Sequence, residues 1–184
     1  MKEEKAIILD FLAEGYPERR HPEPVAQSIG TSNFTLLELV PREGIELIVE
    51  EEVYIGEGKR DKIRYIKGSM KVSDLTNVAR SNLGRIVTDI VKKNEEKFIE
   101  FFNITGMLTP RMHKLQLIPG IGKKHVVDII SARKTKKFES YEDMIKRVKL
   151  FPDPIKSLVK RIMNELEGDE KYHLFTPQAP YPHE

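Results

Sequence analysis

The fold of the last third of this chain is decided by the stretch Leu115-Gln116-Leu117-Ile118-Pro119-Gly120-Ile121-Gly122-Lys123-Lys124. Pro119 and Gly120 must end any helix that arrives from Leu117, and a new helix is predicted from Lys123 to about Arg133. Glycines at 120 and 122 permit positive φ and leave the backbone N–H groups of the turn open to an anion. The free N–H groups and positive dipole end of the following helix point to the same place.

A backbone phosphate is the ligand that this pattern predicts, because it matches both the amides and the charges of the turn. Ile121 is expected to fill the space between the two helices. The alternative is a tight interhelical turn that binds nothing. The residues predicted to form the phosphate site are Gly120, Ile121, Gly122, Lys123 and Lys124.

Local signals around the turn predict further helices. Thr109-Pro110 supplies an N-cap and a first-turn proline for a short helix to about residue 117. Ser140 to Asp143 resembles a capping box that opens a helix to about Val148, and Asp153-Pro154 opens a last helix that ends near Gly168. The tail, residues 169–184, is predicted to be extended and held by Tyr172 and Phe175.

This arrangement resembles the helix-hairpin-helix family over about residues 108–167. Residues 138–143 and 147–148 look like the connector of a tandem domain, and residues 148–154 look like a second hairpin. The second hairpin departs from the family because it lacks both glycines and carries an acid, so we expect it to be structural. The resemblance implies a monovalent cation at the 118–122 hairpin, held by carbonyl oxygens. No other cofactor and no metal site is predicted.

The distribution of charge supports a polyanion-binding segment, although the chain of 184 residues has a net charge of only +2. Residues 111–137 hold eight basic residues and one acid, a local net charge of +7, whereas residues 1–72 hold 14 acids and 11 basic residues, or −3. The alternative is an ordinary solvated helical surface. The basic residues expected to support phosphate binding are Arg111, Lys114, Arg133, Lys134, Lys136 and Lys137.

The N-terminal segment is predicted to be a small antiparallel β-barrel. Apolar or alternating runs at 6–12, 34–40, 46–55 and 62–66 predict strands, and residues 14–33 predict a long loop with at most one helical turn near 25–28. The alternative to a strand-binding barrel is a structural or protein-binding one, because Glu50 to Glu52 would repel nucleic acid. The candidate barrel contacts are Tyr54, Lys59, Arg60, Lys62, Arg64 and Tyr65.

Connecting helices are predicted for residues 73–104. Ser73 is a plausible N-cap, and apolar residues from Leu75 to Val91, Val78 among them, fall on one helical face. Phe98, Ile99, Phe101 and Phe102 follow at helical spacing, which is more typical of a core than of base stacking.

Taken over its whole length, the chain resembles an uncharacterised archaeal family of predicted nucleic-acid-binding proteins. The resemblance rests on residues 8–12 and 34–40, the Val53 to Gly56 turn, residues 101–103 and the Pro-Gly-Ile-Gly turn. It implies an OB-like or S1-like barrel before the hairpins. The expected class is therefore α+β, with a barrel at 1–72, connecting helices at 73–104, an all-α tandem helix-hairpin-helix domain at 105–168 and a tail at 169–184.

Other classes of protein fit the sequence poorly. The absence of cysteine, of an apolar run of about 18 residues and of a leader pattern favours the cytoplasm and argues against a membrane partner. Glu139 and Asp143 are better explained as capping residues than as catalytic acids, so a non-enzymatic protein is expected. Two hypotheses stay open: RNA or DNA binding through backbone phosphates, or an accessory subunit of a ribosomal or repair assembly whose barrel binds protein.

Overall fold

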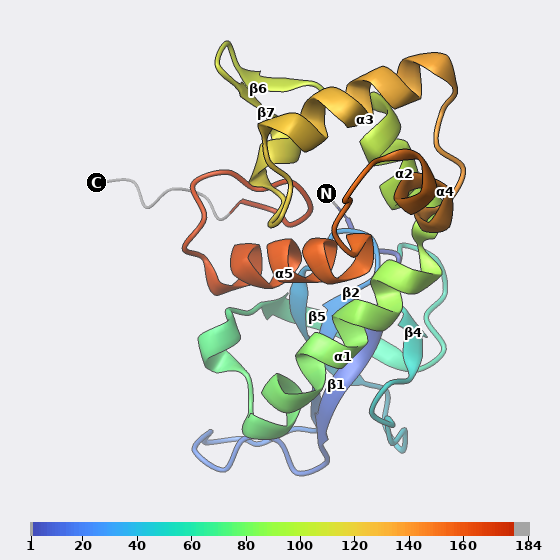
Figure 1. The fold of residues 1–184 in the computed structure, drawn as a ribbon. Coiled ribbons are helices and arrows are strands. Elements are labelled where there is room, and N and C mark those ends of the chain that lie inside the picture. Colours follow the sequence, from blue (N-terminus) through green and yellow to red (C-terminus); the bar gives the residue numbers. More distant parts are fainter. Residues whose placement is uncertain (1, 179–184) are drawn as a thin grey trace. The chain divides into compact units, whose positions relative to one another are not determined.

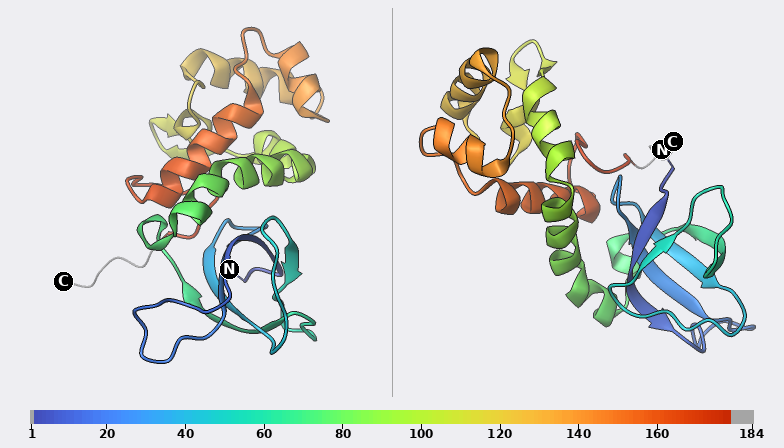
Figure 2. Two further views of the ribbon diagram at one scale, coloured as in Figure 1. Left: turned by 90° about the horizontal axis from the view of Figure 1, so that it is seen from below. Right: turned by 90° about the vertical axis from the view of Figure 1, so that its right-hand side faces the viewer.

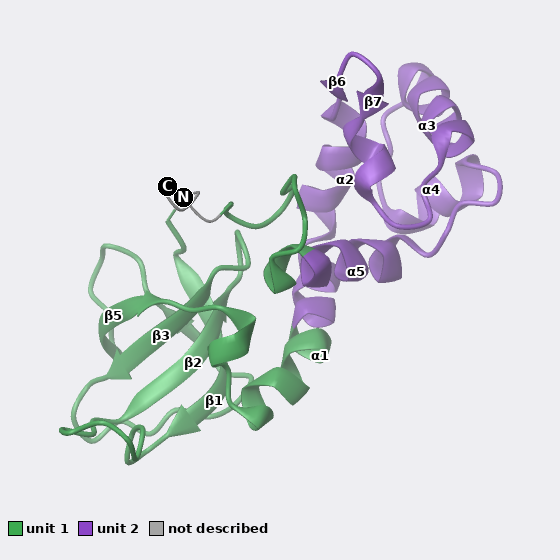
Figure 3. Ribbon diagram, turned by 90° about the vertical axis from the view of Figure 1, so that its left-hand side faces the viewer, with its two compact units in different colours: residues 1–86, 165–184 green, residues 87–164 purple. Residues whose placement is uncertain are grey.

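The computed structural model describes residues 2–178 and has an α+β fold in which a curled antiparallel sheet precedes a set of helices (Figure 1). The expected α+β class and the barrel-like start are therefore confirmed. The chain divides into two compact units (Figure 3). The first contains the residues up to 86 together with those from 165 onward, and the second contains residues 87–164.

The first unit is built on a five-stranded sheet with the order β4-β1-β2-β3-β5. Its strands are β1 (Lys5–Leu12), β2 (Val25–Gly30), β3 (Leu36–Pro41), β4 (Glu52–Tyr54) and β5 (Ile63–Ser69). All four neighbouring pairs are antiparallel. Figure 2 shows the sheet end-on, where the strands curl around a common core. Because β4 and β5 are the edges, the predicted barrel is an open half-barrel in this part of the chain.

The core of the half-barrel lies on the concave face of the sheet. Alternate residues of the strands point into it, as Leu37 and Leu39 do on β3 while Glu38 between them points away. The loop before β4 adds Leu47. Its buried members are Ala6, Ile8, Ala26, Leu37, Leu39, Leu47, Val53, Ile55 and Ile63.

Strand β2 corrects the prediction of a long loop over residues 14–33. All six of its residues are buried, and it pairs with β1 on one side and β3 on the other. Gln27 and Ser28 made the segment look polar, but their side chains hydrogen bond inside the fold. The Gln27 amide donates to the Tyr16 hydroxyl over 2.9 Å, and Ser28 Oγ donates to the Leu37 carbonyl over 3.0 Å.

The predicted strand over residues 46–55 is also shorter than expected. Only Glu52–Tyr54 is extended, because Glu50 adopts a left-handed backbone with φ +72° and turns the chain just before β4. The amide of Glu50 then donates to the Ile8 carbonyl over 2.8 Å, which ties this turn to β1.

Helices α1 (Asn77–Lys93) and α2 (Glu95–Ile104) occupy the predicted connecting segment, after a 3₁₀ turn, η1 (Val72–Asp74). Thr76, and not Ser73, caps α1, since its Oγ1 accepts the amide of Ala79 over 3.0 Å. Val78 was expected on the apolar face but is 50% exposed. Phe98 and Phe102 are buried in α2, as predicted for core residues.

The predicted helix over residues 109–117 is wrong. The segment forms a small hairpin of β6 (Met107–Thr109) and β7 (Met112–His113), followed by a 3₁₀ turn, η2 (Lys114–Leu117). Pro110 therefore lies in the turn of this hairpin and does not begin a helix. His113 then caps η2 through Nδ1, which accepts the amide of Leu115 over 3.1 Å. Helix propensities of the neighbouring residues do not predict this cap.

The remaining helices are α3 (Lys123–Thr135), α4 (Tyr141–Arg147) and α5 (Pro154–Glu167), close to their predicted bounds. Ser140 Oγ accepts the amide of Asp143 over 3.0 Å, which confirms this cap. After Gly168 the tail turns back on α5, because the buried Glu165 carboxylate accepts the backbone amides of residues 174–176. The predicted tail thus folds back over residues 169–178, and its last six residues lie outside the described ones.

Candidate nucleic-acid interface

The turn between η2 and α3 has a backbone shape that requires glycine at one position. Gly120 has φ +85°, in the left-handed region, and the Ile121 amide donates to the Ile118 carbonyl over 3.1 Å to close the turn. Ile118 and Ile121 are buried beneath it, while Gly120 and Gly122 are exposed. The turn therefore holds its apolar residues inward and its glycine backbone outward.

Several backbone groups of this turn have no partner in the described part of the chain. The amides of Gly120, Lys123, Lys124 and His125 donate no hydrogen bond there. The first amide of α3 that donates one is that of Val126, which donates to the Gly122 carbonyl. Gly122 is the N-cap and has no side chain to satisfy these amides. The amide of Ile121 is already used by the turn, so four amides are available where the sequence predicted a phosphate.

His125 occupies the space between this turn and the turn that precedes α5. Its Nδ1 lies 3.4 Å from the Gly122 nitrogen, and its Nε2 lies 3.0 Å from the Leu150 carbonyl oxygen. Its ring also packs edge-on against Phe151. His125 is not among the predicted site residues, and its place in the first turn of α3, beside the predicted phosphate site, is the one sequence signal for this contact.

The turn before α5 repeats the geometry of the first. Phe151 N–H donates to the Val148 carbonyl over 3.3 Å, and Leu150 has φ +54° at the position that corresponds to Gly120. A Cβ added at Gly120 would lie 3.3 Å from the Cβ of Pro152, so the two turns pack closely. The second turn lacks glycine, as the sequence indicated, and Leu150 is 81% exposed.

The predicted basic residues separate into two groups. Arg133 is structural, because its Nη1 donates to the Phe102 carbonyl over 2.8 Å and burial lowers the pKa of its guanidinium. Lys136 and Lys137 form exposed ion pairs with Glu139 and Glu100. The side chains without an ion pair or hydrogen bond in the described chain are those of Arg111, Lys114, Lys123, Lys124 and Lys134.

Two further arginines hold the helical unit together. Arg161 is 3% exposed, and its Nη1 donates to the Leu117 carbonyl over 3.1 Å, just before the first turn. Arg147 donates to the carbonyls of Ala132 and Lys136, which satisfies the end of α3. Basic residues in this unit therefore stabilise backbone as well as supply free charge.

The candidate barrel residues do not form one cluster. Tyr54 and Tyr65 lie on the opposite edge strands β4 and β5. Tyr54 Oη accepts the Gly58 amide, and Lys62 forms an ion pair with Glu51. The remaining basic residues, Lys59, Arg60 and Arg64, form no ion pair in the described chain.

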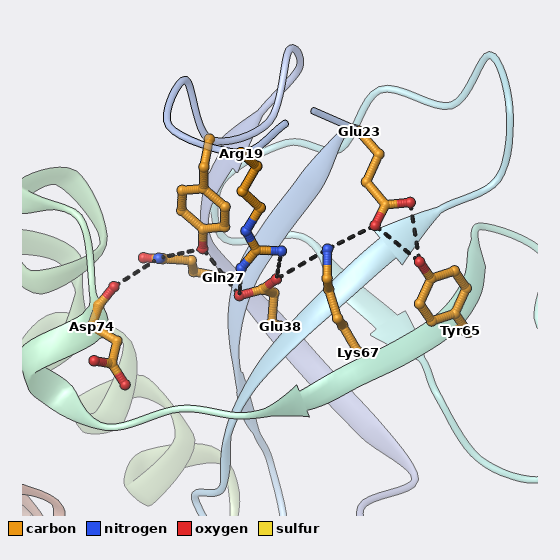
Figure 4. A network of polar contacts seen from close by, with 8 residues as sticks. Arg19, Glu23, Gln27, Glu38, Tyr65, Lys67 and Asp74 are labelled. Atoms are coloured by element: carbon orange, nitrogen blue, oxygen red, sulfur yellow. Dashed lines mark hydrogen bonds and ion pairs between the residues drawn. The ribbon is translucent and has the colours of Figure 1, made fainter. Parts of the chain in front are cut away.

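Tyr65 belongs to a polar network on the outer face of the sheet (Figure 4). Its hydroxyl donates to Glu23 over 3.0 Å, which raises the pKa of Tyr65. Lys67 pairs with the same carboxylate at 2.7 Å and lowers its pKa. Glu38, 8% exposed, pairs with Arg19 at 3.1 Å. The network fastens the β1–β2 loop to the sheet and holds the Tyr65 hydroxyl in place.

Residues 2–178 contain no group of three or more His, Asp or Glu side chains placed to hold a metal ion. None of the described helices is both long enough and apolar enough to span a bilayer.

The geometry thus defines an α+β protein with a curled antiparallel sheet and a helical unit built around two packed turns. The chain belongs to the family described as Protein of unknown function (DUF655), whose model matches residues 2–177. It is 41% identical over 175 residues to the Uncharacterized protein MJ0038 of Methanocaldococcus jannaschii, which covers 94% of this chain and 79% of the relative.

A solved structure shares this fold. The crystal structure of Af1531 from Archaeoglobus fulgidus is similar with a TM-score of 0.83 and 42% sequence identity, over 95% of this chain and 100% of that one. Both relatives come from archaea, in keeping with the archaeal resemblance of the sequence.

Proposed function

We propose that this protein binds nucleic acid without reading its sequence, through backbone phosphates held at the 118–122 turn. The observation that carries the proposal is the group of four amides without a partner in the described chain, at the exposed glycine turn that begins the 13-residue helix α3. Exposed Lys123 and Lys124 stand at the same helix end. Amides and ammonium groups at a helix N-terminus are suited to a phosphate, which carries no base identity.

Residues 105–168 are interpreted in this proposal as a tandem helix-hairpin-helix domain with a degenerate second hairpin. The matched turn hydrogen bonds and left-handed residues at 120 and 150 support the repeat. The segment just before the first turn departs from the family. It is the four-residue 3₁₀ turn η2 and not a regular α-helix in the described residues. The second turn serves as support for the first, through Pro152 and the Leu150 carbonyl.

The proposal extends to a monovalent cation at the first turn. The carbonyls of Pro119, Gly120 and Ile121 accept no backbone hydrogen bond in the described chain, so oxygen atoms of the type that hard cations bind are free. A cation there would draw the glycine backbone and a phosphate together by charge. The protein otherwise needs no cofactor for binding and is proposed to be non-enzymatic and cytoplasmic.

In this proposal the half-barrel adds contacts to single strands, in the manner of an OB-like barrel. Its five curled strands support the assignment, and Lys59 and Arg64 supply charge. The antiparallel pairing of β3 with β5 differs from the parallel pairing of these strands in an OB barrel. RNA and DNA are both candidate polymers, because a phosphate contact does not sense the 2′-hydroxyl.

The test is a salt series of binding to matched single- and double-stranded DNA and RNA. Wild-type affinity is expected to fall steeply with salt, and Lys123→Gln/Lys124→Gln is expected to reduce the logarithmic slope by about 0.9 for each duplex phosphate that the variant no longer neutralises. Lys92→Gln/Lys93→Gln, an equally exposed pair at the end of α1, is the matched control. Repeating the series in potassium and tetramethylammonium salts tests the cation.

A glycine variant tests the backbone part of the site. Gly122→Ala is preferred to Gly120→Ala, since Gly122 has φ −93° and a Cβ there would meet nothing within 4 Å. The variant is expected to fold and to bind more weakly, because its methyl group stands beside the free amides. Wild-type protein that binds none of the polymers at low salt would refute the proposal.

A second candidate function is that of an accessory subunit of a ribosomal or repair assembly. The observation that favours it is exposed apolar surface on the half-barrel, where Ile48 is 71% exposed. Ile48→Ser would then abolish capture of a protein partner and leave polymer binding unchanged. Loss of polymer binding in the lysine variant separates the two functions.

A further inference from the structure

A cavity of about 380 Å³ opens at one end of the half-barrel core. Its walls come from the residues just before β1, the start of β3, the chain after β4, and β5. Every lining residue belongs to the first unit, so the cavity is separate from the 118–122 turn. The volume lies within the range of roughly 300–1,000 Å³ that is typical of small-molecule sites.

The inner wall of the cavity is apolar and fixed. Leu37 and Ile55 are members of the half-barrel core, at 8% and 1% exposed, and Ile66 packs against the same core. A ligand face that rests on these side chains must itself be apolar, since a polar face would lose its hydrogen bonds to water.

One polar atom of the wall lacks a hydrogen bond to the described residues. Thr35 Oγ1 is buried and has no partner among them, although the Thr35 backbone is held by its N–H bond to Glu3 and its carbonyl bond from Gly30. A buried hydroxyl without a partner costs free energy, and native structures rarely keep one unless something binds it. The hydroxyl can both donate to a ligand and accept from it.

Three of the charged groups around the cavity already bond to their own neighbours. The Glu3 carboxylate accepts the backbone amides of Ser32, Asn33 and Thr35 at 2.9, 2.9 and 3.2 Å. Lys2 forms an ion pair with Glu57. The polar atoms of these groups are therefore already in use within the protein.

Two other charged groups are available. Arg60 uses Nε to donate to the Gly56 carbonyl over 2.8 Å, which leaves both of its terminal nitrogens without a partner in the described chain. The Glu4 carboxylate likewise has no hydrogen bond or ion pair there. The cavity thus offers a forked donor and a forked acceptor of opposite charge, which together favour a ligand that is neutral where it is enclosed.

We propose that this cavity binds one unstacked nucleobase, with guanine preferred. A nucleobase has apolar faces for Leu37 and Ile55 and a polar edge for the charged groups. Guanine carries acceptors at O6 and N7 that suit the guanidinium of Arg60, and adjacent donors at N1 and N2 that suit the carboxylate of Glu4. The base comes from a single strand or from a free nucleotide, which share this chemistry.

The inference deepens the proposed function by naming a single-strand subsite, and it rests on that function for the strand. The experiment is a titration of the full ¹⁵N-labelled chain, followed by NMR, with the four nucleoside monophosphates and with short single strands that contain one guanine or none. Guanine ligands are expected to shift the amides of Thr35 and Gly56. An equal affinity for nucleotide and strand identifies the free nucleotide as the ligand, whereas binding of the strand alone identifies nucleic acid.

Variants separate the cavity from the turn. Thr35→Val, Glu4→Gln and Arg60→Met are each expected to weaken guanine binding at least tenfold, and Arg20→Met, at an exposed arginine outside the cavity, is the control. Gly122→Ala should leave nucleotide binding unchanged. Equal affinity for all four bases, or guanine binding that survives Arg60→Met and Glu4→Gln, overturns the inference while the salt-dependent strand binding of the turn would stand.

Discussion

Nε2 of His125 lies 3.0 Å from the carbonyl oxygen of Leu150, so a side chain at the start of α3 bonds the turn that precedes α5. Its Nδ1 faces the Gly122 amide at 3.4 Å. A ring nitrogen that accepts from an amide carries no proton, so the neutral tautomer protonated on Nε2 satisfies both contacts. The two turns are thereby joined by one imidazole.

Replacement of this imidazole is expected to loosen the pair of turns. His125→Phe keeps a ring against Phe151 but removes both hydrogen bonds, so the free energy of unfolding should fall by about 1 kcal/mol. Polymer affinity should fall with it, because the glycine turn is then less firmly supported. Urea unfolding and a binding titration measure the two effects. Unchanged stability would show that the imidazole contacts contribute nothing.

Stability should depend on pH through His113, which is 5% exposed and accepts the Leu115 amide. Burial, followed by the charges of Arg133 and Lys114, lowers the pKa of His113 from its usual 6.5. As the pH falls below 6.5, the unfolded chain therefore binds a proton at this histidine before the folded chain does. The stability that neutral His113 contributes above pH 6.5 is lost progressively until the pH reaches its pKa in the folded state.

The measurement is thermal unfolding at pH values from about 5 to 8, which bracket the usual histidine pKa. His113→Asn keeps an oxygen acceptor for the Leu115 amide and does not titrate, so its loss of stability on acidification should be smaller than that of the wild type. A variant that loses the same stability as the wild type would assign the acid sensitivity to other groups.

Gly30 makes room for the Glu3 carboxylate at the β2–β3 turn. A Cβ at position 30 would lie 2.1 Å from the Glu3 Cδ, so Gly30→Ala is expected to displace Glu3 from its three amides and to cost about 2 kcal/mol or more. In Glu3→Ala the space is vacated, and adding Gly30→Ala should then cost much less. A double-mutant cycle by chemical unfolding checks this, and additive effects would contradict it.

Leu150 carries strain that a change of residue can relieve. Its backbone has φ +54° and its side chain is 81% exposed, whereas left-handed conformations cost a non-glycine residue roughly 1–2 kcal/mol. Leu150→Asn is expected to raise the free energy of unfolding by up to about 1 kcal/mol, because asparagine tolerates this region. Leu150→Ala keeps the strain and should not be stabilised. Equal stability of the two variants would argue against backbone strain.

Sequence patterns predicted the features that neighbouring residues encode. The Pro-Gly-Ile-Gly turn, the start of α3 and the caps at Ser140 and Asp153 follow from a few adjacent residues, whose backbone preferences act before any tertiary contact forms. The apolar spacing of Phe98 and Phe102 likewise marked a buried face. The exposed lysines proposed to bind phosphate at the start of α3 belong to the same local pattern.

Tertiary contacts decided the rest. Gln27 and Ser28 lie in a strand because β1 and β3 flank them, and residues 107–113 form a hairpin where a proline signal predicted a helix. Arg133, Arg147 and Arg161 turn inward because distant carbonyls near helix ends need donors. Residue spacing in the sequence does not predict such partners. A long side chain can bond acceptors that are distant in the sequence and come near only when the protein folds.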